Sequence, residues 1–221
     1  MAGVVYVDGK REDKPGSPFR EDAEVEIAEG ANKYVSRGGL KLERAFEYWD
    51  VDINGKTAMD IGASTGGFTD VMLRAGAEKV FCVDVGYGQL DWKLRNDPRI
   101  VNLERTNIRY LDPSLITVPP DLITIDVSFI SLRLVLPVAV AHLADGGSII
   151  TLVKPQFEAE RGQVGKKGIV RDPAVRDEVI EKVKGYGADN GLVFAGLIES
   201  PITGAKGNVE FLMRFTKSDS G

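Results

Sequence analysis

A glycine-rich segment between two apolar runs has the residue types needed to hold a cofactor. The segment 60–68 (DIGASTGGF) leaves a β-type run, turns on glycines and continues into a predicted helix. Glycine lets the backbone approach a ligand closely, and the first turn of a helix presents unpaired N–H groups. Asp84, 22 residues after Gly62, ends the next β-type run and could accept hydrogen bonds from both hydroxyls of a ribose. Together these features predict a site for an adenosine-type cofactor, while the glycine spacing, which is not Gly-x-Gly-x-x-Gly, disfavours a dinucleotide.

The elements that must position these residues alternate along the chain between strand and helix. Runs of apolar, β-type residues predict strands at 58–62, 79–84, 99–103, 122–127, 148–154, 192–198 and 209–215. Helices are predicted at 38–49, at 67–75 before Gly76, after Ser131 with Pro137 in the first turn or at a kink, and from Asp172-Pro173 toward Gly185 or Gly187. Continuously apolar strands that alternate with helices indicate a parallel sheet covered on both faces. The last two runs have no helix between them, so they should pair as the antiparallel edge of a mixed sheet.

Two segments stand apart from this alternation. Residues 3–7 and 24–27 are predicted as short strands, with a turn at Asp8-Gly9, and two short strands alone cannot bury a core. Residues 1–30 are therefore not a complete domain. The connection 155–171 is the one long loop and contains three glycines; such a loop in a compact domain is commonly a lid or a binding loop.

Composition excludes several classes of protein and site. The 221 residues are 43% hydrophobic and 28% charged, which is typical of a globular protein, and no segment is uniformly apolar over the roughly 20 residues that a membrane helix needs. A single cysteine, Cys82, excludes a disulfide framework and a cysteine-based zinc site, and a single histidine, His142, excludes a multi-histidine metal site. No signal peptide is expected, because Asp8, Lys10 and Arg11 follow the first apolar run at once, so the predicted compartment is a reducing cytoplasm.

The charge is distributed unevenly along the chain. The net charge is −5, which argues mildly against a nucleic-acid binder. Residues 33–44 hold four basic residues and one acid, and residues 154–171 hold five basic residues and two acids, so each segment carries +3. These two segments could bind a polyanion, although two solvated surface stretches would show the same charges.

Six separated motifs, in order along the chain, resemble those of one enzyme family. They are 36–45 (SRGGLKLERA), 60–68 (DIGASTGGF), 83–90 (VDVGYGQL), 123–132 (ITIDVSFISL), 152–158 (LVKPQFE) and 207–211 (GNVEF). Together they resemble the TlyA (hemolysin A) branch of the FtsJ-type RNA ribose methyltransferases. Residues 3–27 resemble the C-terminal half of the small RNA-binding domain named after ribosomal protein S-four, without its basic helical first half. The resemblance thus implies a remnant of that domain at 1–30 and a methyltransferase domain at 31–217.

The resemblance also implies a fold and a cofactor. The fold is the Rossmann-like α/β fold of class I S-adenosylmethionine-dependent methyltransferases, a mixed seven-stranded sheet with strand order 3-2-1-4-5-7-6 and an antiparallel last strand. The cofactor is S-adenosyl-L-methionine, and no metal is implied. By motif, the cofactor contacts fall on Asp60, Gly62, Ser64 and Gly66 for the methionine part, Asp84 for the ribose, and Asn107 and Ile108 for the adenine.

The catalytic residues implied by the family form a Lys-Asp-Lys-Glu tetrad, which falls on Lys41, Asp126, Lys154 and Glu210. The strand pattern supports this set, because parallel strands four and five end at the same edge of the sheet, where open α/β sheets bind ligands, which places Asp126 beside Lys154. Glu210 is expected in the last strand and Lys41 in the helix before the sheet. A ribose 2′-hydroxyl is a poor acid, so Lys154 is assigned as its base or as the cation that steers the alkoxide, with the other three residues orienting it and the ribose.

The predicted function is therefore S-adenosylmethionine-dependent 2′-O-methylation of RNA, with ribosomal RNA and a cytidine target implied by the family. Phe129 and Phe157 are candidates for stacking a flipped base. Other methylation chemistries fit less well, because 126–129 (DVSF) lacks the Asn/Asp-Pro-Pro-Tyr pattern of base-amine enzymes and Cys82 lies inside a predicted strand. Two alternatives stay open: a hemolysin-like membrane-active protein, and a non-catalytic RNA-binding or ribosome assembly factor on a methyltransferase fold. Membrane insertion is not expected, and the oligomeric state is left open.

Overall fold

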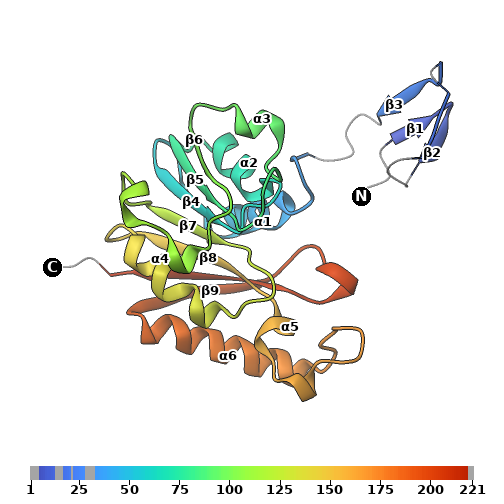
Figure 1. The fold of residues 1–221 in the computed structure, drawn as a ribbon. Helices are drawn as coiled ribbons and strands as arrows, with labels where there is room; N and C mark the ends of the chain where they lie inside the picture. Colours follow the sequence, from blue (N-terminus) through green and yellow to red (C-terminus); the bar gives the residue numbers. More distant parts are fainter. Residues whose placement is uncertain (1–4, 13–16, 21, 28–32, 219–221) are drawn as a thin grey trace. The chain divides into compact units, whose positions relative to one another are not determined.

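The computed structural model describes residues 5–12, 17–20, 22–27 and 33–218 (Figure 1). The chain divides into two compact units, Met1–Lys33 and Tyr34–Gly221.

The first unit contains a three-stranded antiparallel sheet. Strand β1 (Val5–Val7) lies between β2 (Lys10–Glu12) and β3 (Val25–Ile27). The predicted strands at 3–7 and 24–27 correspond to β1 and β3 over their described residues, and the turn at Asp8-Gly9 is confirmed, with positive φ at both residues. Strand β2 was not predicted, because its sequence Lys-Arg-Glu carries no apolar pattern.

The second unit is built on one seven-stranded sheet with the order β6-β5-β4-β7-β8-β10-β9. Its strands are β4 (Thr57–Ile61), β5 (Lys79–Val83), β6 (Ile100–Leu103), β7 (Leu122–Ile125), β8 (Ser148–Val153), β9 (Leu192–Glu199) and β10 (Phe211–Lys217). The first five are parallel, and β10 runs antiparallel to both β8 and β9. Counted within this sheet, the order is 3-2-1-4-5-7-6, which confirms the predicted topology and the antiparallel last strand.

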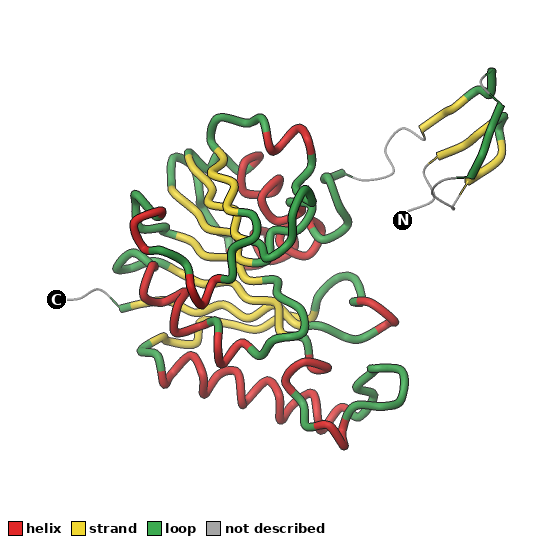
Figure 2. The backbone as a smooth tube through the Cα atoms, in the orientation of Figure 1, coloured by secondary structure: helices red, strands yellow, loops and turns green. Residues whose placement is uncertain are grey.

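Helices lie on both sides of the strands (Figure 2). They are α1 (Gly39–Trp49), α2 (Gly67–Arg74), α3 (Trp92–Arg95), α4 (Leu136–His142), α5 (Pro155–Glu158) and α6 (Pro173–Asp189). The apolar residues of α1 and α2 pack with alternate sheet residues such as Ala58 and Val80. Those of α4 and α6 pack with the intervening residues such as Met59 and Phe81. Because side chains alternate across a strand, the sheet is buried on both faces, as its continuous apolar runs predict.

Helix α6 extends beyond its predicted end at Gly185 or Gly187 and stops at Asp189. Gly187 does not terminate the helix: a side chain there would collide with the ring of Phe215, which is fully buried in β10. The glycine thus serves close packing of helix on sheet. The prediction that 155–171 is entirely loop is also wrong, because this segment contains α5 and a 3-10 turn at Arg161–Gln163.

Candidate active site

Two neighbouring cavities open where the parallel strands end. One has a volume of about 240 Å³ and the other about 510 Å³, and both are lined by Gly62, Ser64, Asp126 and Ser128. These residues follow β4 and β7, the two central parallel strands. The cavities therefore lie at the carboxyl edge of the sheet, where open α/β folds bind their ligands.

The glycine segment after β4 forms the wall between the sheet and the cavities. Gly62 has a φ of +85°, and a side chain there would collide with the backbone carbonyl oxygen of Asp126. Gly66, with a φ of +93°, immediately precedes α2, so the chain turns sharply and the first turn of the helix is reached at Gly67. Ser64 also has a positive φ, of 49°. The predicted close approach of backbone to ligand thus has a local physical basis in these turns.

Asp60, the last acidic residue before the turn, is almost completely buried beneath the smaller cavity. Its carboxylate accepts hydrogen bonds from Oγ1 of Thr69 at 2.7 Å and Oγ1 of Thr124 at 3.0 Å. Burial, with a smaller contribution from the negative charge of Asp126, raises the pKa of Asp60 to about 6, against the lowering effect of the two threonines. The charge at the base of this cavity therefore depends on pH in the physiological range.

Asp84, directly after β5, joins the two loops around the larger cavity. Its Oδ2 accepts a hydrogen bond from the backbone N–H of Ser64 at 2.8 Å, and its Oδ1 accepts one from Gly86 at 2.6 Å. Asn107 and Ile108 line the same cavity from the loop after β6. The structure thus brings together, around one cavity, the residues predicted for the ribose and the adenine.

The four predicted catalytic residues form two ion pairs. Lys154 Nζ lies 2.6 Å from Asp126 Oδ1 and donates a hydrogen bond to Ser128 Oγ at 2.9 Å. Lys41 Nζ lies 2.6 Å from Glu210 Oε2, and these side chains are only 9% and 3% exposed. Glu210 precedes β10 instead of lying inside it, which corrects the predicted strand at 209–215.

Strand register explains why the two pairs meet at one edge. Phe211 of β10 is paired with Val153 of β8, so the next residues outward, Glu210 and Lys154, lie opposite each other at the ends of antiparallel neighbours. Lys154 therefore lies between two acidic residues at this edge: Asp126, which follows β7 on one side, and Glu210, which precedes β10 on the other.

Two residues near this edge were not predicted. Ser128 is a partner of Lys154, and Glu158 accepts hydrogen bonds from Oγ of Ser131 at 2.6 Å and from the N–H of Leu132 at 2.7 Å. Burial raises the pKa of Glu158, against these hydrogen bonds. Glu158 fastens the segment after β8 to the segment after β7, the same two segments that carry Lys154 and Asp126. The position of Glu158 in the motif 152–158 was the feature of the sequence that could have indicated its role.

The two aromatic residues proposed for base stacking lie side by side. The ring centroids of Phe129 and Phe157 are 5.0 Å apart, and Phe129 is 91% exposed. Phe129 has a φ of +64°, which is unusual for a bulky residue. The Lys154 ammonium lies 5.9 Å from the centroid of Phe157. An exposed aromatic surface therefore adjoins the Lys154–Asp126 pair.

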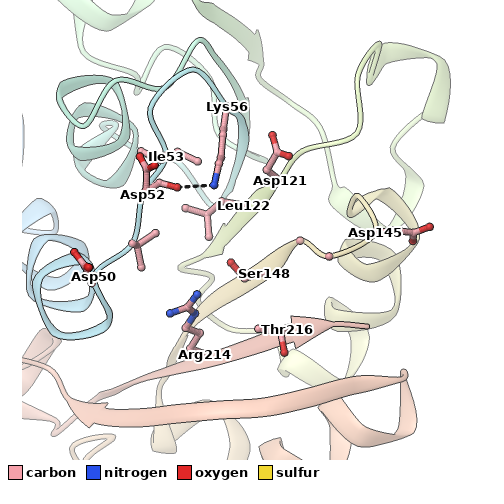
Figure 3. A pocket seen from close by; sticks show the side chains of 13 residues that line it. Asp50, Asp52, Ile53, Lys56, Asp121, Leu122, Asp145, Ser148, Arg214 and Thr216 are labelled. Atoms are coloured by element: carbon pink, nitrogen blue, oxygen red, sulfur yellow. Dashed lines mark hydrogen bonds between the residues drawn. The ribbon is translucent and has the colours of Figure 1, made fainter. Parts of the chain in front are cut away.

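A third cavity, of about 380 Å³, lies at the opposite edge of the sheet (Figure 3). It is lined by residues that precede the parallel strands, such as Lys56 before β4 and Asp121 before β7, and Arg214 points into it. Lys56 Nζ donates a hydrogen bond to the backbone carbonyl of Asp52 at 2.9 Å. None of the six sequence motifs contributes to this cavity.

Within the described residues, no three His, Cys, Asp or Glu side chains lie together in a way that could hold a metal ion. In the same part of the chain, no helix is long and apolar enough to cross a membrane. Cys82 is buried inside β5, and burial raises the pKa of its thiol, which keeps it protonated.

Comparison with known proteins gives consistent results. The family model described as FtsJ-like methyltransferase matches residues 34–217. The chain is 52% identical, over 96% of its length and 76% of the relative's, to a Bacillus subtilis protein, YqxC, provisionally named an rRNA methyltransferase. It is 44% identical, over 96% of its length and 80% of the relative's, to the 16S/23S rRNA (cytidine-2′-O)-methyltransferase TlyA of Mycobacterium tuberculosis. A solved structure from Streptococcus thermophilus, provisionally named a hemolysin, superimposes with a TM-score of 0.86 at 48% identity and covers 100% of this chain and 81% of that one.

Proposed function

The chain belongs to the FtsJ-like methyltransferase family, and from this premise we propose that it methylates ribose 2′-hydroxyl groups of ribosomal RNA. The methyl donor is S-adenosylmethionine, and the relative named a cytidine-2′-O-methyltransferase supports cytidine as the target nucleoside. The observation that carries the proposal is the position of Lys154, held by Asp126 and Ser128 at the wall of a cavity that the glycine turn also lines. A ribosomal substrate would place the enzyme in the cytoplasm.

The residues around the two cavities fit the donor. Asp84 offers carboxylate oxygens for the ribose hydroxyls, Asn107 and Ile108 border the place for the adenine, and the turn at Gly62 leaves space for the methionine part. Asp60, when ionised, supplies a negative charge below the smaller cavity, which favours a cationic ligand. When bound, S-adenosylmethionine supplies an electrophilic methyl group on a positively charged sulfur.

Lys154 acts on the acceptor hydroxyl. A ribose 2′-hydroxyl loses its proton with difficulty, so transfer needs a group that takes the proton or stabilises the developing negative charge. The ammonium of Lys154 is fixed by one carboxylate and one hydroxyl, which sets its direction at the cavity wall. A neutral amine would take the proton directly, and an ammonium would stabilise the alkoxide; either role requires this nitrogen at this place.

The other members of the tetrad position Lys154 and the ribose. Asp126 holds the ammonium directly. Glu210 lies opposite Lys154 in the β8–β10 register, and its charge is balanced by the buried ion pair with Lys41, so this pair would orient the ribose beside Lys154. Much of the rate enhancement in such a site comes from holding the acceptor in line with the transferred methyl group.

RNA is held by the basic segments 33–44 and 154–171, which begin or end near tetrad lysines. The adjacent rings of Phe129 and Phe157 would stack a base turned out of its helix. Residues 1–30, which resemble part of an RNA-binding domain, contribute little to the fold of the methyltransferase unit.

The decisive experiment is methyl transfer from labelled S-adenosylmethionine to unmethylated ribosomal subunits, followed by mapping of the modified nucleotide. We expect a 2′-O-methylated cytidine with the wild-type chain and almost none with Lys154→Ala. Subunit binding with no methyl transfer would instead favour an assembly factor. Leakage of lipid vesicles at micromolar protein, with no RNA modification, would favour the membrane-active alternative suggested by the hemolysin names.

A further inference from the structure

One buried side chain, that of Asn208, joins two loops near the catalytic edge. Asn208 is 2% exposed; its Nδ2 donates a hydrogen bond to the carbonyl of Gly168 at 2.8 Å, and its Oδ1 accepts one from the N–H of Val170 at 3.1 Å. The loop 159–172 before α6 is thereby fastened to the loop 200–210 before β10. Both loops lie toward the same end of α6 in Figure 1.

Each loop exposes lysine at a tight turn. In the first, the N–H of Gly165 donates to Ile169 and that of Gly168 donates to Gly165, so Lys166 and Lys167 lie at the tip and are exposed. In the second, Lys206 is exposed with a φ of +62° inside the 3-10 turn Ala205–Gly207.

The side chain of Lys206 in the second turn reaches the first turn. The ammonium of Lys206 lies against Gly168: a methyl group added to Gly168 would be 3.9 Å from Nζ. Residues 161–171 and 201–209 together contain five basic residues and no acid. None of Lys166, Lys167 and Lys206 forms an ion pair with an acidic side chain in the described part of the chain. Cations placed together without counter-charges form a surface that favours a polyanion.

This surface is connected directly to the catalytic edge. Asn208 is two residues before Glu210, and the Glu210 carboxylate occupies the place where a side chain at Gly204 would lie. The same loop is held by hydrogen bonds from Gly204 N–H to Asn208 and from Ser200 N–H to Glu210. The loop that carries Lys166 and Lys167 begins shortly after Lys154. A polyanion bound here would therefore contact segments that continue into both Lys154 and Glu210.

We propose that Lys166, Lys167 and Lys206 form one RNA phosphate-binding surface, and that Asn208 is the positioning residue that holds its two halves together. The proposal rests on the proposed function and deepens it by naming where the RNA backbone is held. RNA is favoured over an anionic membrane because the surface continues into the tetrad, and because the exposed parts of the two turns supply lysines without large apolar side chains to enter a lipid layer.

The test compares variants of equal charge. Lys206→Gln removes one cation at the surface, and Lys56→Gln removes one at the opposite edge of the sheet. We expect Lys206→Gln to weaken binding to unmethylated ribosomal subunits and to reduce the slope of log affinity against log salt by about 0.7–0.9, the contribution of one phosphate contact. Lys56→Gln should leave the slope unchanged. Equal changes of the salt slope in the two variants would overturn the proposed phosphate-binding surface, even if the wild-type chain methylates RNA. Absence of methylation by the wild-type chain would instead contradict the proposed function.

A double-mutant cycle tests Asn208. Asn208→Ala should weaken subunit binding at least about twofold while cofactor affinity stays unchanged. Lys206→Gln should reduce subunit affinity by a smaller factor in the Asn208→Ala variant than in the wild-type chain. Asn190→Ala is the matched control, since it removes a side-chain amide that donates to the Tyr186 carbonyl at the far end of α6. If Asn208→Ala does not fold, Asn208→Asp keeps the acceptor for Val170 and serves in the same cycle. Additive effects would overturn the positioning role, and competition between RNA and anionic vesicles for the same lysines would overturn RNA as the specific partner.

Discussion

Replacement of Asp60 by asparagine should remove a pH dependence that is built into the base of the smaller cavity. Burial raises the pKa of Asp60 from 3.8 to about 6 in the folded chain. The unfolded chain therefore gives up this proton at lower pH than the folded chain does. Consequently the contribution of Asp60 to the free energy of unfolding is most favourable below pH 3.8 and is progressively lost as pH rises to about 6.

The size of the effect follows from the two pKa values. A rise from 3.8 to about 6 corresponds to about 3 kcal/mol lost in total, of which about 1 kcal/mol is lost between pH 5 and pH 7. Asparagine does not titrate, and the hydroxyls of Thr69 and Thr124 can rotate to accept hydrogen bonds from its amide. The difference in unfolding free energy between Asp60→Asn and wild type should therefore move by about 1 kcal/mol in favour of the variant over this interval.

The assay is urea unfolding of both proteins, without cofactor, at half-unit steps from pH 5 to pH 7.5. Subtraction of the two curves removes the contributions of other groups, including Glu158. A second measurement is the affinity for S-adenosylmethionine, which carries two positive charges. That affinity should rise through pH 6 in the wild type and lack this rise in Asp60→Asn, because only an ionised Asp60 attracts a cation. A pH-independent difference in unfolding free energy would refute the reasoning that Asp60 is held protonated by burial.

Four further outcomes are expected. Lys154→Ala should reduce methyl transfer by about 10²–10⁴-fold with cofactor affinity nearly unchanged in calorimetry, and near-full activity of Lys154→Arg would exclude the base role, because a guanidinium does not lose its proton. Asp84→Ala should weaken cofactor binding by about 1.5–3 kcal/mol in calorimetry, the range for a hydrogen bond to a charged group. Glu158→Gln should lower kcat more than it changes the KM for cofactor in steady-state kinetics, because the segments carrying Lys154 and Asp126 lose a charged anchor. Removal of residues 1–30 should leave the melting temperature and cofactor affinity nearly unchanged, and a large fall in either would show that this segment supports the second unit.

The sheet could be predicted because the residue types within each strand and the order of strands and helices along the chain indicate the same fold. Each buried strand is a continuous apolar run, and the run that became β4 is followed at once by glycines whose positive φ values the turn requires. What the sequence did not predict depends on tertiary contacts. Gly187 resembles a helix end by type, yet its role is set by the Phe215 ring, which is 28 residues away in the chain. Strand β2 has only charged residues, and it belongs to the sheet through its antiparallel pairing with β1, which the apolar pattern does not indicate.

The structure brings the four predicted tetrad residues to one edge of the sheet, but the sequence predicts only part of how they are connected. The motifs named all four tetrad residues, and the structure arranges them as Lys154 with Asp126 and Lys41 with Glu210. Ser128, Glu158 and Asn208 were missed because their roles depend on hydrogen bonds across 26 to 40 residues of chain. All three lie inside the sequence motifs, but their residue types are common in loops, so the sequence alone does not show which group each side chain binds.

The antiparallel last strand is what makes the tetrad possible. Parallel strands end at one edge, so β7 and β8 bring Asp126 and Lys154 together without further help. A parallel β10 would begin at the opposite edge, beside the cavity of Lys56 and Asp121, and the residue before it could not reach Lys154. Because β10 is reversed, the residue that precedes it lies at the carboxyl edge, opposite the residue that follows β8. The strand reversal and the position of Glu210 one residue before β10 are therefore parts of the same arrangement, and an insertion of one residue between Glu210 and Phe211 should separate the carboxylate from Lys41 while leaving the sheet paired.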